Sequence, residues 1–130
     1  MVAVDLTSGG VADRIAVSGR PRGMAFSPDH ATLYVALSAA PDAGDEEDED
    51  KAGPARIDGV AAIDVASARV LRVLPAGKDP VRVAISRDGR TLFAADQADG
   101  AVTEIATDGS GRPRTIAVCE TPEGLAIASQ

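Results

Sequence analysis

The hydrophobic positions of this chain fall in short runs separated by turn-forming residues, and no run keeps a helical period. The runs 23–27 and 82–86 interleave small and apolar residues, and each precedes a run of β-branched, aromatic and apolar residues, at 32–37 and 91–95. The links between them, SPDHA and SRDGR, contain Pro, Asp and Gly, which favour tight turns. Further short runs lie at 60–65, 70–74, 102–106 and 114–118. Short strands spaced about ten residues apart predict an all-β fold.

The strand pattern is also an internal repeat. The phrase RPRGMAFSPDHATLYVAL at 20–37 returns as DPVRVAISRDGRTLFAAD at 79–96, with Pro21 aligned on Pro80 and Ser27 on Ser86, 59 residues later. A partial third copy, TPEGLAIA, begins at 121 and follows the second copy after 42 residues. An acidic segment at about 41–58 accounts for the longer first spacing. The underlying period is therefore about 42 residues.

A unit of about 42 residues with four short strands is typical of a β-propeller blade. With the strands of a blade labelled A to D from the channel outwards, the chain reads C-D, A-B-C-D, A-B-C-D, A. We therefore expect one partial propeller over 1–130, of about 2.75 blades. Its parts are strands C and D at 1–19, blades at 20–77 and 78–119, and strand A of a further blade at 120–130.

The repeat resembles the YVTN β-propeller family, whose phrase runs approximately P-x-G-[VIL]-A-[VF]-S-P-D-G-x-x-L-Y-V-x-N. PRGMAFSPDHATLYVAL matches it well, PVRVAISRDGRTLFAAD moderately, and PEGLAIA begins another copy. His30 replaces the turn glycine, and Leu37 and Asp96 replace the asparagine. The resemblance implies an exported propeller that binds partners, although related propellers also occur inside enzymes.

Composition narrows the remaining possibilities. The formal net charge is −7, but residues 42–51 contribute −6, so the rest of the chain is nearly neutral and has no basic stripe for nucleic acid. No apolar run is long enough to span a membrane. No signal peptide is visible, which predicts a cytoplasmic location if the chain is complete, whereas the resemblance implies a periplasmic or extracellular one. Cys119 is the only cysteine, so no internal disulfide can form, and we expect it to be a small core residue.

The acidic segment lies between strands B and C of the first full blade, above the channel entrance. Its composition cannot bury much apolar area, so we expect a disordered, solvated loop. A weak cation site or a site for a basic partner is the alternative. The segment lacks the alternating spacing of a defined calcium loop. The candidate cation ligands are Asp45, Glu46, Asp48, Glu49 and Asp50.

The B–C and D–A loops of a propeller share one face, and we expect any ligand to bind there. The candidate residues of that face are Arg20, Arg22, Lys78, Asp79, Arg82, Glu120 and Glu123, with ordinary surface charge as the alternative. The recurring acids Asp5, Asp64 and Glu104 are expected to bond backbone groups in C–D turns. The single histidine, His30, falls in an A–B turn. No catalytic residue and no cofactor is expected.

About 2.75 blades cannot close a ring, since propellers have four to eight blades, and terminal repeats normally carry polar caps that this chain lacks. We therefore expect self-association or further blades. A non-enzymatic binding or scaffold module is the favoured function. The alternatives are a fragment or subunit of a propeller enzyme, of the lactonase or quinone-dependent dehydrogenase type, and a structural remnant.

Overall fold

The fold is all-β. The computed structural model describes residues 1–4, 6–17, 19–39 and 57–127. The strands are β1 (Val2–Val4), β2 (Val11–Arg14), β3 (Arg20–Phe26), β4 (Thr32–Ser38), β5 (Gly59–Asp64), β6 (Arg69–Leu74), β7 (Pro80–Ile85), β8 (Thr91–Asp96), β9 (Ala101–Ala106) and β10 (Arg114–Ala117). The described residues include no helix that could cross a membrane.

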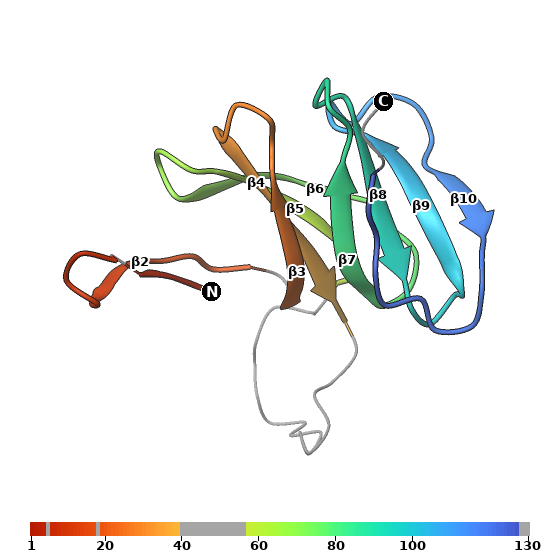
Figure 1. The fold of residues 1–130 in the computed structure, drawn as a ribbon, viewed down its shortest axis with the longest axis horizontal. Coiled ribbons are helices and arrows are strands. Elements are labelled where there is room, and N and C mark those ends of the chain that lie inside the picture. The colour runs from red at the N-terminus through yellow and green to blue at the C-terminus, as the bar shows by residue number, and fades with distance from the viewer. Residues whose placement is uncertain (5, 18, 40–56, 128–130) are drawn as a thin grey trace, which may run out of the picture.

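The strands form two four-stranded antiparallel sheets and one hairpin (Figure 1). The sheets are the meanders β3-β4-β5-β6 and β7-β8-β9-β10, each in chain order, and β1 pairs with β2. This order is the A-B-C-D order predicted for a blade. The two sheets stand next to each other with their first strands, β3 and β7, in contact. The prediction of four-stranded antiparallel blades is confirmed.

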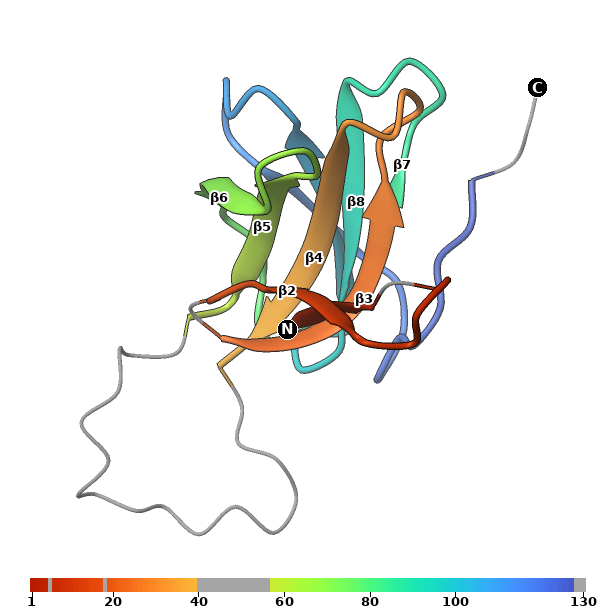
Figure 2. The ribbon, with the colours of Figure 1, turned by 90° about the vertical axis from the view of Figure 1, so that its left-hand side faces the viewer.

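The repeated Ser, Asp and Thr of the two copies build the same turn between strands A and B. The Ser27 hydroxyl donates to Asp29 Oδ1 at 2.6 Å and accepts from the Thr32 amide at 3.0 Å. The second blade repeats both bonds at the same distances with Ser86, Asp88 and Thr91. Both turns lie at the same end of the molecule (Figure 2). The phrase therefore repeats because its polar residues tie off the hairpin.

His30 takes the left-handed backbone conformation that this turn requires. Its φ is 59°, and the equivalent Gly89 has a φ of 72°. A histidine tolerates this region less well than glycine. Its ring lies against Phe26, with the centroids 5.5 Å apart. The sequence correctly placed His30 in the A–B turn. This turn lies at the end of the blades opposite the β6–β7 linker.

Apolar side chains alternate between the two faces of the first blade. One set packs between the sheets and forms what we call the first seam, which comprises Tyr34, Ala36, Val60, Ala62, Leu74, Val83, Leu92, Ala94 and Ile105. The other set faces the N-terminal side and comprises Ile15, Leu33, Val35, Leu37, Ala61 and Ile63. Burying one Val or Leu side chain stabilises a fold by about 1.5–3 kcal/mol, so these two layers hold the sheets together.

The inner strands approach closely at one glycine. A Cβ atom at Gly23 of β3 would lie 2.6 Å from the carbonyl oxygen of Val81 and 3.0 Å from Cα of Arg82, both on β7. Backbone atoms cannot yield to such a contact as a flexible side chain can. The close contact of the two blades at their inner edge therefore depends on the missing side chain at position 23.

Three expectations differ from the structure or fall outside it. Cys119 is exposed and not a core residue, because no further blade covers this end of the second sheet. Residues 122–127 contain no strand, since no neighbouring strand is hydrogen-bonded to them, and their assignment to a further strand A stays a prediction. The acidic segment connects β4 to β5 as predicted, but residues 40–56 lie outside the described residues, as does Asp5.

We predict that Gly23→Ala destabilises the protein by about 1–3 kcal/mol, because the new methyl group pushes apart the β3 and β7 backbones. Urea unfolding followed by circular dichroism measures the change. The matched control is Gly124→Ala, at the aligned position of the third copy, where a Cβ atom would have no neighbour within 4 Å. Equal unfolding midpoints for the Gly23 variant and the wild type would contradict the close-contact interpretation.

Candidate functional site

The connections opposite the A–B turns form one surface, which we call the loop face. It consists of Ala39 and Asp58 at the described ends of the β4–β5 connection, the β6–β7 linker 75–79, and the β8–β9 turn 97–100. An antiparallel meander places these connections at one end by necessity. The prediction that the B–C and D–A loops share a face follows from this topology.

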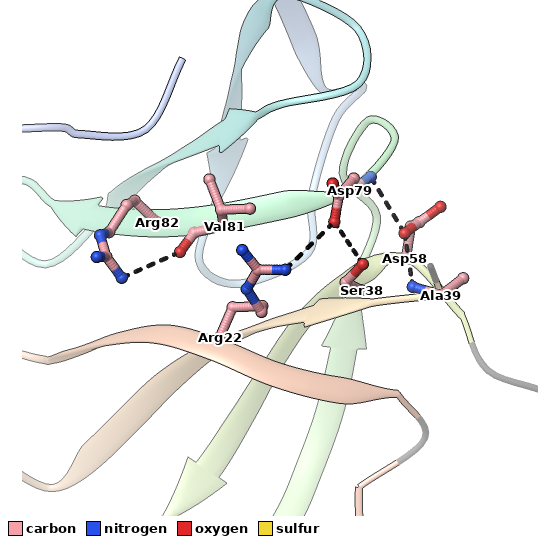
Figure 3. Close-up of polar contacts among 7 residues, drawn as sticks. All are labelled: Arg22, Ser38, Ala39, Asp58, Asp79, Val81 and Arg82. Carbon is pink, nitrogen blue, oxygen red and sulfur yellow. Dashed lines mark hydrogen bonds and ion pairs between the residues drawn. The ribbon is translucent and has the colours of Figure 1, made fainter. Parts of the chain in front are cut away.

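Asp79 is the centre of the polar contacts on the loop face (Figure 3). Its Oδ1 accepts a hydrogen bond from the Ser38 hydroxyl at 2.5 Å and lies 3.9 Å from Arg22 Nη1. The two ion-pair side chains are 29% and 19% exposed, so they are partly shielded from water. Ser38 ends β4 and Arg22 lies in β3, whereas Asp79 precedes β7. The contacts therefore join the two blades.

The backbone at Asp79 is left-handed, with a φ of 56°. This conformation is uncommon for a residue other than glycine and persists where surrounding contacts hold it. Here the Asp79 amide donates to Asp58 Oδ1 at 3.2 Å, and its carbonyl oxygen accepts from the Gln97 amide at 2.9 Å. The linker is thus tied to both blades through backbone and side chain.

Asp58 closes the β4–β5 connection. Its Oδ1 accepts from the Ala39 amide at 2.8 Å as well as from the Asp79 amide. Ala39 is the last described residue before the acidic segment, and Asp58 lies just after it. One carboxylate therefore fixes both ends of that connection beside the linker.

A second group of carboxylates lies between the linker and the second blade. Asp96, at the end of β8, is completely buried, and its Oδ2 accepts from the Thr103 hydroxyl. Asp99 Oδ2 accepts from the Lys78 amide at 2.8 Å. A Cβ atom at Gly77 would lie 2.6 Å from both Asp96 Oδ2 and Asp99 Oδ2, so a larger residue there would displace the carboxyl groups. Burial raises the pKa of Asp96, against the hydrogen bond from Thr103, which lowers it.

The structure brings together only part of the predicted ligand face. Arg22 and Asp79 pair directly, whereas the Lys78 amide donates to Asp99. Arg20 starts β3 and is paired in the ladder with Ser38. Arg82 lies in the middle of β7, where its guanidinium reaches the Val81 carbonyl oxygen at 3.5 Å (Figure 3).

Glu120 and Glu123 follow the second blade and take no part in the contacts around Asp79. Glu120 lines an open hollow of about 660 Å³ with the β8–β9 turn and residues 117–121, including the exposed thiol of Cys119. Glu123 is exposed. The candidate cation ligands Asp45, Glu46, Asp48, Glu49 and Asp50 lie outside the described residues.

The recurring acids differ in their contacts. Asp64 Oδ2 accepts from the amide and the hydroxyl of Ser67 in the C–D turn, as predicted. Glu104 instead pairs with Arg114 across the β9–β10 ladder, with Oε2 3.9 Å from Nη1, so its described contact is an ion pair and not the predicted bond to a turn backbone group.

Sequence reasoning missed Ser38, Asp58 and Asp99, and it noted Asp96 only as a departure from the family phrase. A usable signal existed, because all four lie at the B–C ends of strands. The topology that brings those ends together with the linker was predicted, but the close contacts between side chain and backbone depend on the loop conformations.

The described part of the loop face carries charged and hydrogen-bonding groups. Within the described ranges, no three His, Cys, Asp or Glu side chains are grouped so that they could hold a metal ion. The imidazole of His30 lies at the opposite end of the blades and cannot assist a nucleophile on the loop face. The exposed polar groups that remain are carboxylates and basic side chains, which bind charged or hydrogen-bonding partners.

No protein-family model and no curated protein matches the sequence. Several solved structures are similar in fold. Hydrazine synthase from Kuenenia stuttgartiensis has a TM-score of 0.69 at 24% identity, over 92% of this chain and 30% of that one. A gluconolactonase from Xanthomonas campestris has a TM-score of 0.53 at 21% identity, over 92% and 34%. A protein from Lactobacillus plantarum has a TM-score of 0.54 at 21% identity, over 87% and 31%.

These likenesses concern the fold alone, because the identities are low. This chain spans about a third of the length of the proteins that it resembles. Together with the two meander sheets, they show that the chain is an all-β segment of a β-propeller built from four-stranded antiparallel blades.

Proposed function

We propose that this chain is a non-enzymatic binding or scaffold module of a β-propeller. It acts through the loop face and is completed by further blades, supplied by self-association or by additional propeller sequence. The observation that carries the proposal is the exposed apolar part of the outer face of the second blade, where Ile116 occupies the position that Leu74 occupies in the first seam.

The comparison of the two faces is direct because the strand registers agree. Val60 pairs with Leu74 in the first blade, and Val102 pairs with Ile116 in the second. Leu74 is 2% exposed in the first seam, whereas Ile116 is 37% exposed at the free face, and Val118 beside it is 50% exposed. Adjacent exposed apolar side chains on a sheet favour association. The matching pattern favours a propeller blade as the covering partner.

The chain after the second blade supports the same proposal. Thr121 precedes Pro122 with a φ of 49°, as Asp79 precedes Pro80 with a φ of 56°. A β-branched residue is strained in this region. In the first linker, contacts from both blades hold this conformation. The repeated conformation at 121 therefore fits a second linker that leads into a strand A.

The loop face is proposed as the ligand surface because charged side chains remain accessible there after the structural contacts are made. Lys78, Asp99 and Glu120 are exposed, whereas Arg22 and Asp79 are engaged with each other. We infer a partner that carries charged groups. The residues that hold the linker in place are then positioning residues for that surface.

The second candidate function is a fragment or subunit of a propeller enzyme. It is favoured by the similarity to a gluconolactonase and to hydrazine synthase, in both of which this chain covers about a third of the length. In that case the reactive groups lie on other blades or on a partner, since the described loop face has no such constellation.

We predict that the wild-type chain self-associates with increasing concentration and that Ile116→Glu weakens this association at least about tenfold, because it buries a charge in the proposed blade contact. Sedimentation velocity measures both. Thr115→Glu, on the opposite face of β10, is the matched control. A wild-type chain that stays monomeric at every concentration would contradict self-association as the route of completion.

Binding through the loop face predicts salt-sensitive affinity for a charged peptide. Oligolysine and oligoglutamate peptides are the probes, and fluorescence anisotropy gives the affinity. Either Lys78→Ala or Asp99→Asn should lower the affinity for the peptide that binds about tenfold. Arg87→Ala, in the opposite A–B turn, should leave that affinity unchanged. Failure of both peptides to bind at low salt would count against a charged partner.

A catalytic assay of the isolated chain tests whether it carries an active site of its own. We expect no turnover of gluconolactone above the buffer rate, measured by release of acid in a pH-indicator assay. Turnover that disappears in Asp79→Asn or Glu123→Gln, with retained circular dichroism, would favour an enzyme over a binding module.

A further inference from the structure

Asp96 is a buried carboxyl at a position that is apolar in the first blade. The repeat aligns Asp96 with Leu37, and it aligns Thr103, whose hydroxyl bonds Asp96, with Ala61. In the first blade, Leu37 and Ala61 are completely buried and belong to an apolar layer. The fold therefore does not require a carboxyl here. Its presence in the second blade calls for another physical role.

The carboxyl of Asp96 is incompletely satisfied. Oδ2 accepts from the Thr103 hydroxyl and is bonded to the Gly77 backbone, whereas Oδ1 is buried with no hydrogen-bond partner among the described residues. An ionised carboxylate oxygen without a donor is costly in the interior of a protein. A protonated carboxyl has one hydroxyl donor and so changes what the group can bond.

The charges around Asp96 do not compensate an ionised form. Asp99 in the β8–β9 turn and Asp58 at the end of the β4–β5 connection both raise its pKa by repulsion. On the linker, the side chain of Lys78 is exposed and its backbone amide donates a hydrogen bond to Asp99. Asp79 pairs with Arg22 of β3. Arg20 also lies at this end of β3 and has interactions of its own.

The geometry places this group at the contact between the linker and the second blade. A Cβ atom at Gly77 would touch Asp96 and Asp99 at once, so both carboxyl groups lie against the linker backbone. Directly after Gly77, hydrogen bonds connect linker and turn: Ala98 donates to the Lys78 carbonyl oxygen at 3.3 Å, and Gln97 donates to that of Asp79 at 2.9 Å. A change at Asp96 therefore acts directly on the conformation of the loop face.

We propose that Asp96 makes the contact between the 75–79 linker and the second blade depend on protonation. With its proton, Asp96 is a neutral group that can donate to the neighbouring carboxylate of Asp99, and the linker is held against the β8–β9 turn. Loss of the proton to solvent leaves a buried anion beside two other carboxylates, and the linker loosens. The arrangement of Lys78 and Asp79 on the loop face then depends on pH. This inference does not require the proposed binding function.

The direction of the pH dependence follows from the raised pKa of Asp96. In the unfolded chain the group ionises near the ordinary carboxyl value, whereas the folded state retains the proton to higher pH. Its contribution to stability is therefore fully present below the ordinary value and is lost as the pH rises towards the raised value. Other carboxyl groups act in the opposite direction. The Ser86 hydroxyl lowers the pKa of exposed Asp88, so its contribution is lost as the pH falls.

Asp96→Asn tests the proposal in the full chain, because an amide keeps the shape and the donor but cannot ionise. Between about pH 4.5 and pH 8 we expect the thermal midpoint of the wild type to fall relative to this variant by about 4–8 °C. The control Asp88→Asn should change the pH dependence on the acid side, where the wild type loses the contribution of ionised Asp88, and should run parallel to the wild type over the neutral range. Parallel profiles for the wild type and Asp96→Asn over the neutral range would overturn the proposal.

A second measurement keeps the test independent of the variant's folding. Amide hydrogen exchange of Gln97 and Ala98 in the wild type, corrected for intrinsic rates and compared with Ala94 inside β8, reports linker opening. We expect protection of both amides to fall at least about tenfold relative to Ala94 over the same pH range. Carbon-13 titration of the Asp96 carboxyl, with a midpoint at or below the ordinary aspartate value, would also overturn the proposal.

Discussion

The close packing of β3 against β7 is the contact on which the rest of the structure depends. Two antiparallel sheets meet most tightly at their inner strands, and at Gly23 the contact is between backbone and backbone. Farther out, apolar side chains of the later strands, such as Val60, Leu74 and Ile105, fill the space between the sheets. The sheets thus touch at their inner strands and are held apart by side chains farther out, which gives a wedge. That shape leads each blade to expose one face unless a neighbour covers it.

The loop face is organised by carboxylates that bind backbone amides. Asp99 and Asp58 accept from the Lys78 and Asp79 amides at the end of the linker, and Asp79 accepts from Ser38 of the preceding blade. Hydrogen bonds to charged acceptors are stronger than those between neutral groups, and they hold a loop of uncommon conformation. Asp96 differs from these residues because it is buried and lacks a donor for one oxygen. The same surface therefore contains carboxylates that stabilise its conformation as anions and one whose ionisation opposes it.

The two outer faces of the described blades differ in how far their apolar side chains are covered. On one side, Ile15 and Val17 cover part of the apolar layer of the first blade. On the other side, Ile116 and Val118 remain exposed. An open hollow also remains between residues 97–100 and 117–121. Coverage of about a third of each similar structure agrees with this incomplete burial.

The sequence by itself determined the strands, their meander order and the A–B turns. Short-range chemistry explains this: Ser27, Asp29 and Thr32 lie within one hairpin, and strand periodicity reports which residues share a face. Tertiary structure alone decided that Asp58, Asp79 and Asp99 meet around one linker, and that Cys119 is exposed. These results depend on loop conformations and on whether a neighbouring blade is present. Neither is encoded in the local pattern, because the contacts join residues about 20 to 40 positions apart.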